Sequence, residues 1–226
     1  MTARGLTIGR GSTAIAGPLD FSLGGGEALI VTGPNGSGKS TLLRTLAGLL
    51  RPLAGRIAVT GVAAPDGEPA RTLAEIAHYV GHRNAMKPGV SVRDNLVFWA
   101  KFLGGPGLEI DAALDAVGLP GLSHLPFGYL SAGQQRRIAL ARLVAVHRPV
   151  WILDEPTAAL DAASQARFAG LMAAHVDAGG SIIAATHQPL GLVAARELAM
   201  TAASAATVDG DTTSADAELA AAEGWL

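Results

Sequence analysis

The chain has 226 residues, of which 49% are hydrophobic and 16% charged, and its formal net charge is −2 at pH 7. The length is enough for one sizeable core but too short for two full domains. The lack of a basic excess argues against nucleic-acid binding, and the lack of cysteine excludes disulfides, zinc-thiolate sites and thiol catalysis. The N-terminus lacks the apolar segment of a signal peptide, and no apolar run approaches the roughly 20 residues of a membrane-spanning helix. We therefore expect a cytoplasmic protein that has no membrane span and reaches a membrane only through a partner.

Apolar runs and turn residues predict an alternation of strands and helices along the chain. Strands are expected at 27–32, 56–60, 77–80, 150–153 and 181–186, and helices at 40–50, 91–103, 111–117 and 162–176. The strand, helix and strand between residues 150 and 186 form a βαβ unit, which indicates a parallel sheet. The fold class is therefore α/β. Residues 201–226 are rich in Ala, Asp, Thr and Ser without clear periodicity, and we interpret them as a tail.

A glycine-rich loop between the first expected strand and helix matches the phosphate-binding pattern G-x-x-x-x-G-K-[ST]. Glycines allow backbone N–H groups to surround a phosphate, while Lys39 can reach the outer phosphates and the Ser40 hydroxyl can bind Mg²⁺. A simple glycine-rich turn is the alternative, and the correct register of Lys39 and Ser40 argues against it. The expected nucleotide-binding residues are Gly33, Pro34, Asn35, Gly36, Ser37, Gly38, Lys39, Ser40 and Thr41.

Three polar residues follow expected strands, where the ligands of α/β folds bind. Asp154 ends the strand at 150–153 and is a candidate Mg²⁺ ligand, and Glu155 is a candidate base that polarises the attacking water. His187 follows the strand at 181–186 and could hydrogen-bond a γ-phosphate or the water. Helix-capping acids and an incidental histidine are the structural alternatives.

Together with these residues, the motif Leu-Ser-Ala-Gly-Gln-Gln at 130–135 makes the chain resemble the ATP-binding cassette (ABC) ATPases. The resemblance implies a P-loop NTPase fold with an N-terminal antiparallel β portion, a helical subdomain at about 84–146 and a single ATPase domain at 1–200. It implies two identical chains that share two ATP molecules, each with Mg²⁺, so that Ser131 and Gly133 of one chain contact the γ-phosphate held by the other. We place Gln134 in the same nucleotide-binding set. The catalytic set expected is Glu155, His187 and Lys39, with Ser40 and Asp154 as metal ligands.

The chain departs from the family pattern at three places. Ala132 stands where the family usually has glycine, and Arg83 stands where the family has a glutamine lining the magnesium site. The early segment at 8–15 lacks the aromatic residue that commonly stacks on adenine. Arg10 could stack there through its guanidinium plane, or it could be a solvated loop arginine.

Longer stretches, such as 130–143, 151–156 and 186–190, resemble one subfamily, the ATP-binding subunit of bacterial cytochrome c maturation haem exporters. This resemblance implies an integral-membrane haem exporter subunit as partner, docked on the helical region after Arg83, and a peripheral location on the cytoplasmic face of the inner membrane. Phe98, Trp99 and Phe102 could form part of the docking groove or belong to the helical core.

Three other functions share parts of the pattern. They are the ATPase of another small transporter, for lipid or metal-chelate substrates, a soluble ABC ATPase in translation or DNA repair, and a regulatory module with little turnover. The soluble ATPases usually carry two cassettes or a coiled-coil insertion, and this sequence shows neither. Arg83 is the only hint of the regulatory module.

Overall fold

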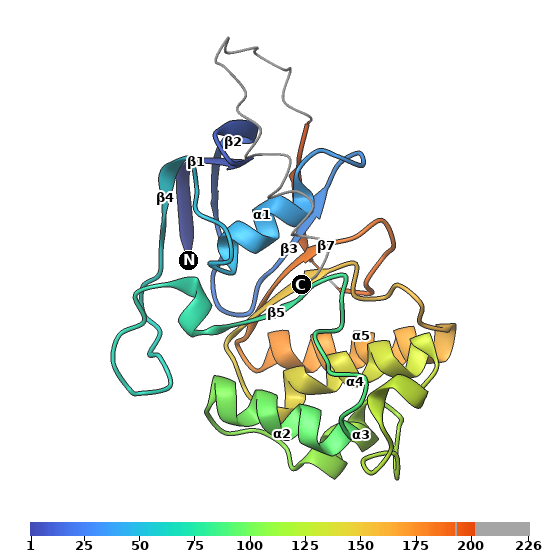
Figure 1. Ribbon diagram of the computed structural model, residues 1–226. Coiled ribbons are helices and arrows are strands. Elements are labelled where there is room, and N and C mark those ends of the chain that lie inside the picture. The colour runs from blue at the N-terminus through green and yellow to red at the C-terminus, as the bar shows by residue number, and fades with distance from the viewer. Residues whose placement is uncertain (193, 202–226) are drawn as a thin grey trace.

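The computed structural model describes residues 1–192 and 194–201 (Figure 1). Its core is a five-stranded parallel sheet with the strand order β5-β6-β7-β3-β8. These strands are β3 (Ala28–Thr32), β5 (Ala77–Val80), β6 (Val150–Asp154), β7 (Ser181–Ala185) and β8 (Arg196–Ala199). The predicted α/β fold with a mainly parallel sheet is confirmed, and so is the βαβ unit that joins β6 to β7. The predicted tail lies outside the described residues from position 202 onward.

A second, antiparallel sheet of order β2-β1-β4 is built mainly from the N-terminal segment. It consists of β1 (Thr2–Arg10), β2 (Thr13–Ser22) and β4 (Ala54–Ala58). The antiparallel portion implied by the family resemblance is therefore present. Strands β1 and β2 themselves were not located in the sequence, because β-bulges and glycines interrupt the alternation of apolar and polar residues along β1.

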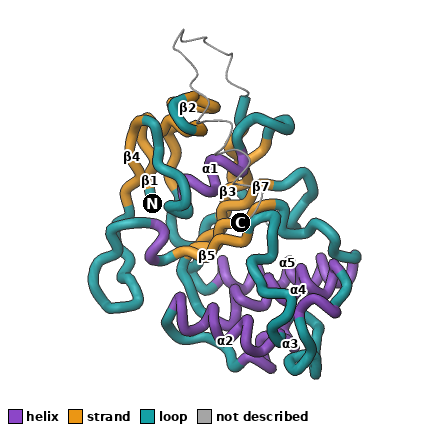
Figure 2. Tube along the Cα trace, in the orientation of Figure 1, coloured by secondary structure: helices purple, strands orange, loops and turns teal. Residues whose placement is uncertain are grey.

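Most helices gather on one side of the large sheet, away from β1, β2 and β4 (Figure 2). The α-helices are α1 (Lys39–Leu46), α2 (Val92–Leu103), α3 (Ile110–Ala116), α4 (Ala132–Ala145) and α5 (Ala162–Asp177), and two short 3₁₀ helices span Leu73–Glu75 and Phe127–Tyr129. The predicted start of α2 is confirmed, since the hydroxyl oxygen of Ser91 accepts a hydrogen bond from the Asp94 backbone N–H.

Three buried apolar clusters among the described residues hold these layers together, and the interior strand β6 contributes to two of them. Val150 and Ile152 face a cluster that includes α1 and residues of the antiparallel sheet, whereas Trp151 and Leu153 face a cluster that includes α4 and α5. Successive side chains point to opposite faces of a strand, so a strand covered on both faces is apolar throughout. This continuous apolar run is why β6 could be recognised in the sequence.

Helix α4 connects the sheet to the other helices because it is buried on two sides. Its Leu140 and Leu143 pack in the cluster of the large sheet, while Ile138 and Ala141 pack in a third cluster with α2 and α3. The later turns of α4 thus pack against both the large sheet and the neighbouring helices.

Candidate active site

The loop after β3 is shaped by glycines that no other residue could replace without strain. Gly33 has φ +138° and Gly38 has φ +95°, and a Cβ on Gly33 would lie 2.3 Å from the Met200 carbonyl oxygen. A Cβ on Gly38 would lie 2.8 Å from a methyl carbon of Ile15. The loop therefore curls tightly before α1, and the first N–H groups of that helix face an open pocket that suits an anion.

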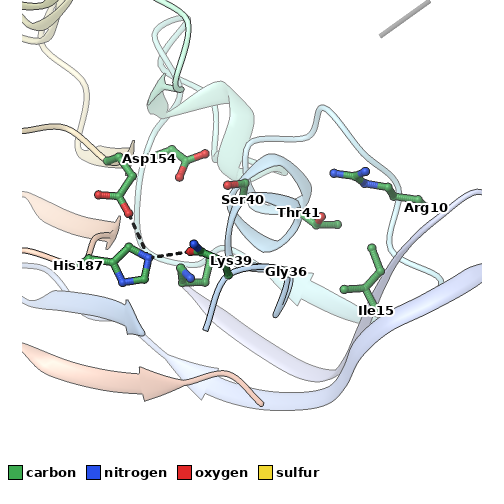
Figure 3. Close-up of a pocket in the computed structure, with 11 residues that line it drawn as sticks. Arg10, Ile15, Gly36, Lys39, Ser40, Thr41, Asp154 and His187 are labelled. Atoms are coloured by element: carbon green, nitrogen blue, oxygen red, sulfur yellow. Dashed lines mark hydrogen bonds and ion pairs between the residues drawn. The ribbon is translucent and has the colours of Figure 1, made fainter. Parts of the chain in front are cut away.

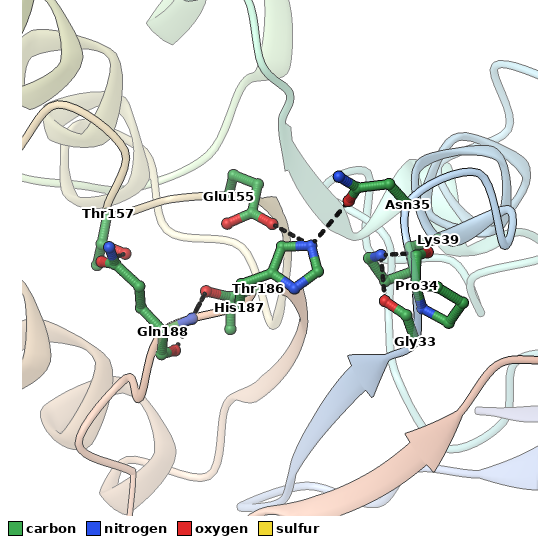
Figure 4. Close-up of polar contacts among 9 residues, drawn as sticks. All are labelled: Gly33, Pro34, Asn35, Lys39, Glu155, Thr157, Thr186, His187 and Gln188. Carbon is green, nitrogen blue, oxygen red and sulfur yellow. Dashed lines mark hydrogen bonds and ion pairs between the residues drawn. The ribbon is translucent and has the colours of Figure 1, made fainter.

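The ammonium group of Lys39 lies inside this loop. Its Nζ atom donates hydrogen bonds to the carbonyl oxygens of Gly33, at 2.7 Å, and Pro34, at 3.0 Å (Figure 4). The lysine is buried at 8% exposure, so its charge is concentrated at the loop rather than in solvent. Ser37 is buried behind the same loop, and its hydroxyl has no hydrogen-bond partner within the part of the chain that the structure describes.

Asp154 and Glu155 stand at the end of β6, as the sequence predicted. Asp154 is 6% exposed and lines the pocket. Glu155 has φ +46°, a left-handed conformation that is uncommon for a residue with a side chain. Its backbone N–H donates to the Ala185 carbonyl oxygen at 2.9 Å, which ties it to the end of β7.

His187 links the loop to the end of β6. Its Nε2 atom lies 3.1 Å from the amide oxygen of Asn35 and 3.7 Å from a carboxylate oxygen of Glu155 (Figure 4). The histidine follows β7, and its neighbour Thr186 is fixed by a hydroxyl bond to the Gln188 carbonyl oxygen at 3.1 Å. The imidazole is thus placed between the phosphate loop and the candidate base.

These groups surround one pocket of about 430 Å³ (Figure 3). Its lining is Arg10, Ile15, Asn35, Gly36, Gly38, Lys39, Ser40, Thr41, Asp154, Glu155 and His187. The structure therefore brings together most of the expected catalytic, metal-binding and loop residues, while Gly33, Pro34 and Ser37 support the loop. Arg10 and Ile15 come from the β1–β2 hairpin. No sequence motif marks Ile15, and its place in the pocket follows only from the β1–β2 hairpin.

The structure does not bring Ser131, Gly133 and Gln134 into this pocket. Ser131 is exposed at the start of α4, where it forms a reciprocal capping box with Gln134. The Ser131 hydroxyl accepts from the Gln134 backbone N–H at 3.2 Å, and the Ser131 N–H donates to the Gln134 side-chain oxygen at 2.9 Å. Within one chain, the side chain of Gln134 thus has a structural partner rather than a ligand.

Comparison with known proteins assigns the chain to a class. Residues 16–158 match the model of the ABC transporter family. The chain belongs to this family of ATP-binding ATPases. Among its relatives is the cytochrome c biogenesis ATP-binding export protein CcmA of Rhizobium meliloti (strain 1021), which is 55% identical over 206 residues, covering 89% of this chain and 97% of the relative. CcmA of Brucella abortus (strain 2308) is 56% identical over 192 residues, covering 85% and 87%.

A solved structure agrees with this assignment. An ABC transporter ATP-binding protein from Pyrococcus furiosus superposes with a TM-score of 0.74 at 25% identity, over 88% of this chain and 96% of that one. The P-loop fold of the ABC ATPase type, implied by the sequence motifs, is therefore confirmed.

Proposed function

We propose that this chain is the ATP-hydrolysing subunit of a membrane complex that exports haem, or releases it from a carrier, in c-type cytochrome biogenesis. The observation that carries the proposal is the gathering of Lys39, Asp154, Glu155 and His187 around one pocket in a chain 55% identical to a cytochrome c biogenesis export protein. The haem assignment rests on the resemblance to that subfamily, because the pocket itself is built for a nucleotide.

Each pocket residue has a role that follows from its position. Lys39 and the N-terminus of α1 would hold the outer phosphates of ATP. Glu155 would accept a proton from the attacking water, and His187, 3.7 Å from that carboxylate, would bond the water or the γ-phosphate. No Phe, Tyr or Trp is among the described residues that line the pocket, which leaves the side chains of Arg10 and Ile15 to contact the base.

The donor set in the pocket suits a magnesium ion brought in with ATP. Mg²⁺ usually takes one or two protein ligands, together with phosphate oxygens and waters. The Ser40 hydroxyl and the Asp154 carboxylate, which both line the pocket, supply such ligands. When bound, the ion would neutralise charge on the phosphates.

We further propose that two copies of the chain complete each other's sites. Ser131, Gly133 and Gln134 stand outside the pocket of their own chain, at the N-terminus of α4. The N–H groups of that helix start attract anions. A second copy placed head to tail would bring them to the open side of the pocket, where the γ-phosphate of a bound ATP would lie.

The membrane partner is expected to dock on α2. Among residues 1–192 and 194–201, no helix is long and apolar enough to cross a bilayer. From the similarity to export proteins, we place the chain as a peripheral subunit on the cytoplasmic face of the inner membrane. Phe98 and Phe102 on α2 are 54% and 69% exposed and stack on each other. Trp99 is half-buried, and its indole N–H donates to the Ala85 carbonyl oxygen at 2.9 Å. The two exposed phenylalanines support a docking surface.

The shared site is tested with Glu155→Gln, which keeps the shape of the side chain but removes the base. We expect this variant to bind ATP, to hydrolyse it about 10²–10⁴-fold more slowly than the wild type and to accumulate as an ATP-bound dimer, measured by light scattering with and without ATP. The wild-type chain should form only a transient dimer under the same conditions. A Glu155→Gln chain that stays monomeric with ATP would contradict the shared site.

The haem assignment is tested in cells that lack this chain. Those cells should lose their c-type cytochromes, detected by haem staining of membrane proteins. The wild-type chain should restore them, whereas Lys39→Ala should not. Full cytochrome levels in the deletion strain would contradict the role in cytochrome biogenesis and favour another transporter.

A further inference from the structure

Arg136 is a buried cation that binds the backbone of the catalytic segment. It lies in α4, is 4% exposed, and its side chain reaches the end of β6. Its Nε–H donates to the Pro156 carbonyl oxygen at 3.1 Å, and its Nη2 donates to the carbonyl oxygens of Asp154 at 3.0 Å and Glu155 at 2.7 Å. Three consecutive carbonyl groups around the candidate base are therefore held by one side chain.

The remaining donors of Arg136 bind the segment after β5. Its Nη1 donates to the Gly81 carbonyl oxygen at 2.8 Å and lies 3.5 Å from the Asn84 side-chain oxygen. A guanidinium group has five N–H donors in a rigid plane, and these five acceptors occupy all of them. The planar fork of arginine can hold both segments at once, and the single ammonium of a lysine cannot.

Burial of the Arg136 guanidinium costs desolvation free energy, so a purely stabilising role explains it poorly. Burial lowers the pKa of Arg136, because the charged form loses its hydration, and the nearby charges of Asp154 and Glu155 only partly oppose this effect. A buried ionic group is weak evidence for stabilisation, since its desolvation can exceed what its contacts return. The position of the group beside Glu155 suggests a role in the reaction.

The backbone of Glu155 needs such support. A non-glycine residue at φ +46° carries backbone strain, and this conformation persists only where the surroundings fix it. The N–H of Glu155 donates to the Ala185 carbonyl oxygen, and its own carbonyl oxygen accepts from Arg136 at 2.7 Å and from the Ala158 N–H at 3.2 Å. Without Arg136, the Glu155 carbonyl keeps only the longer bond from the Ala158 N–H. The peptide that follows Glu155 is then held less firmly, and so is the carboxylate.

We propose that Arg136 is a positioning residue that fixes the Glu155 carboxylate for water activation and links its position to the 81–84 segment. The proposal rests on the role proposed above for Glu155. Arg136 itself does not line the pocket, so it acts through the backbone at 154–156 and makes no contact with ATP.

Arg142 provides a matched control on the same helix. It is also buried, and its guanidinium donates to the Tyr79 carbonyl oxygen at 2.6 Å and lies 4.2 Å from the centre of the Trp99 ring. These contacts join α4 to β5 and α2, at a distance from the catalytic segment. Replacement of Arg142 by lysine should therefore lower stability without changing the chemical step.

The experiment compares Arg136→Lys with Arg142→Lys in the complex of the full chain with its membrane subunit. We expect Arg136→Lys to lower kcat roughly 10²-fold, because small displacements of a reacting group cost about that much. KM for ATP and the affinity for ATP should change by less than about threefold, since the bonds to the phosphates are intact. Arg142→Lys should keep the wild-type kcat. Equal losses of kcat in both variants, or a change in KM alone, would overturn the proposal.

A double variant distinguishes the role proposed for Arg136 from the role proposed for Glu155 as the base. In the Glu155→Gln background, Arg136→Lys should cause no further loss of hydrolysis, because residues that act as a unit are not additive. An additive loss would overturn the positioning role. Full activity of Glu155→Gln by itself would instead refute the role of Glu155. Arg136→Gln, which keeps part of the donor set, provides a second variant, and failure of both Arg136 variants to fold would show that the arginine serves stability only.

Discussion

The ammonium group of Lys39 has two hydrogen-bond partners within its own loop. Its ammonium group is bonded to the carbonyl oxygens of Gly33 and Pro34, so an incoming phosphate must be recognised by a charge that the loop has fixed in place. A fixed charge loses little side-chain entropy on binding, which favours affinity.

Replacement of Lys39 by alanine should therefore remove both ATP affinity and hydrolysis. We expect turnover by the assembled complex to fall at least about 10²-fold, because a principal electrostatic contact to the outer phosphates is lost. Nucleotide affinity is measured with the isolated chain by calorimetry. Lys101→Ala, an exposed lysine near the end of α2 and outside the pocket, is the control and should bind like the wild type. Undiminished turnover in Lys39→Ala would refute the loop assignment.

Residues with a local motif were predictable from the sequence, and residues placed by long-range contacts were not. Lys39, Ser40 and Asp154 sit where their flanking strands and helices indicate. Arg136 could not be recognised as a partner of Glu155, because the two are brought together only when α4 packs beside β6. Ile15 reaches the pocket through a hairpin whose alternation is interrupted.

At the scale of single elements, the capping box at the start of α4 determines the stability of that helix end. Gln134→Ala should destabilise the chain by about 1 kcal/mol, because the Ser131 N–H loses its partner. Gln134→Glu should retain the stability, since glutamate can accept the same bond. The measurement is urea unfolding followed by circular dichroism. Equal loss of stability in both variants would contradict the capping role.

The exposed face of α2 is expected to matter for assembly and not for folding. Phe98→Ser and Phe102→Ser should leave the unfolding free energy of the isolated chain within about 0.5 kcal/mol of the wild type, as for most exposed positions. Both should weaken co-purification with the membrane subunit. Leu49→Ser, at a similarly exposed position beyond α1, is the control. Normal assembly of the double phenylalanine variant would place the docking surface elsewhere.

For the whole molecule, two buried histidines make stability depend on pH. Burial lowers the pKa of His78 from 6.5 to about 3 and that of His175 from 6.5 to about 4. His78 bonds the Val146 carbonyl oxygen, and His175 stacks on Trp151 at 4.0 Å between ring centres. Both imidazoles are thus neutral in the folded protein near pH 7.

Acidification below about pH 6.5 should therefore destabilise the fold. The unfolded chain takes up protons on these histidines while the folded chain does not, so the stability present at pH 7 is lost progressively as the pH falls toward 4. At pH 5, each histidine contributes a loss of about 2 kcal/mol. His175→Phe keeps an aromatic ring against Trp151 and should lose correspondingly less between pH 7 and 5 in urea unfolding. Identical pH profiles for wild type and variant would exclude His175 as a source.

The interior strands of the large sheet were more predictable from the sequence than its edge strand β8. The strands at the centre of the sheet are apolar on both faces and stand out in the sequence, as β6 does. The edge strand β8 was not predicted, because it is short, largely exposed and follows no apolar pattern. Its register beside β3 is set by tertiary pairing.

That edge strand has a consequence for the behaviour of the protein in concentrated solution. An exposed strand edge offers unpaired backbone groups on which another chain can add a strand and begin an aggregate. β8 has only four residues, and Arg196 and Glu197 place opposite charges there. The Thr32 hydroxyl donates a hydrogen bond to the Glu197 carboxylate, and Arg196 forms an ion pair with Glu27. These contacts hold both side chains in place. The short, charged edge thus protects the sheet from intermolecular strand addition and so from aggregation.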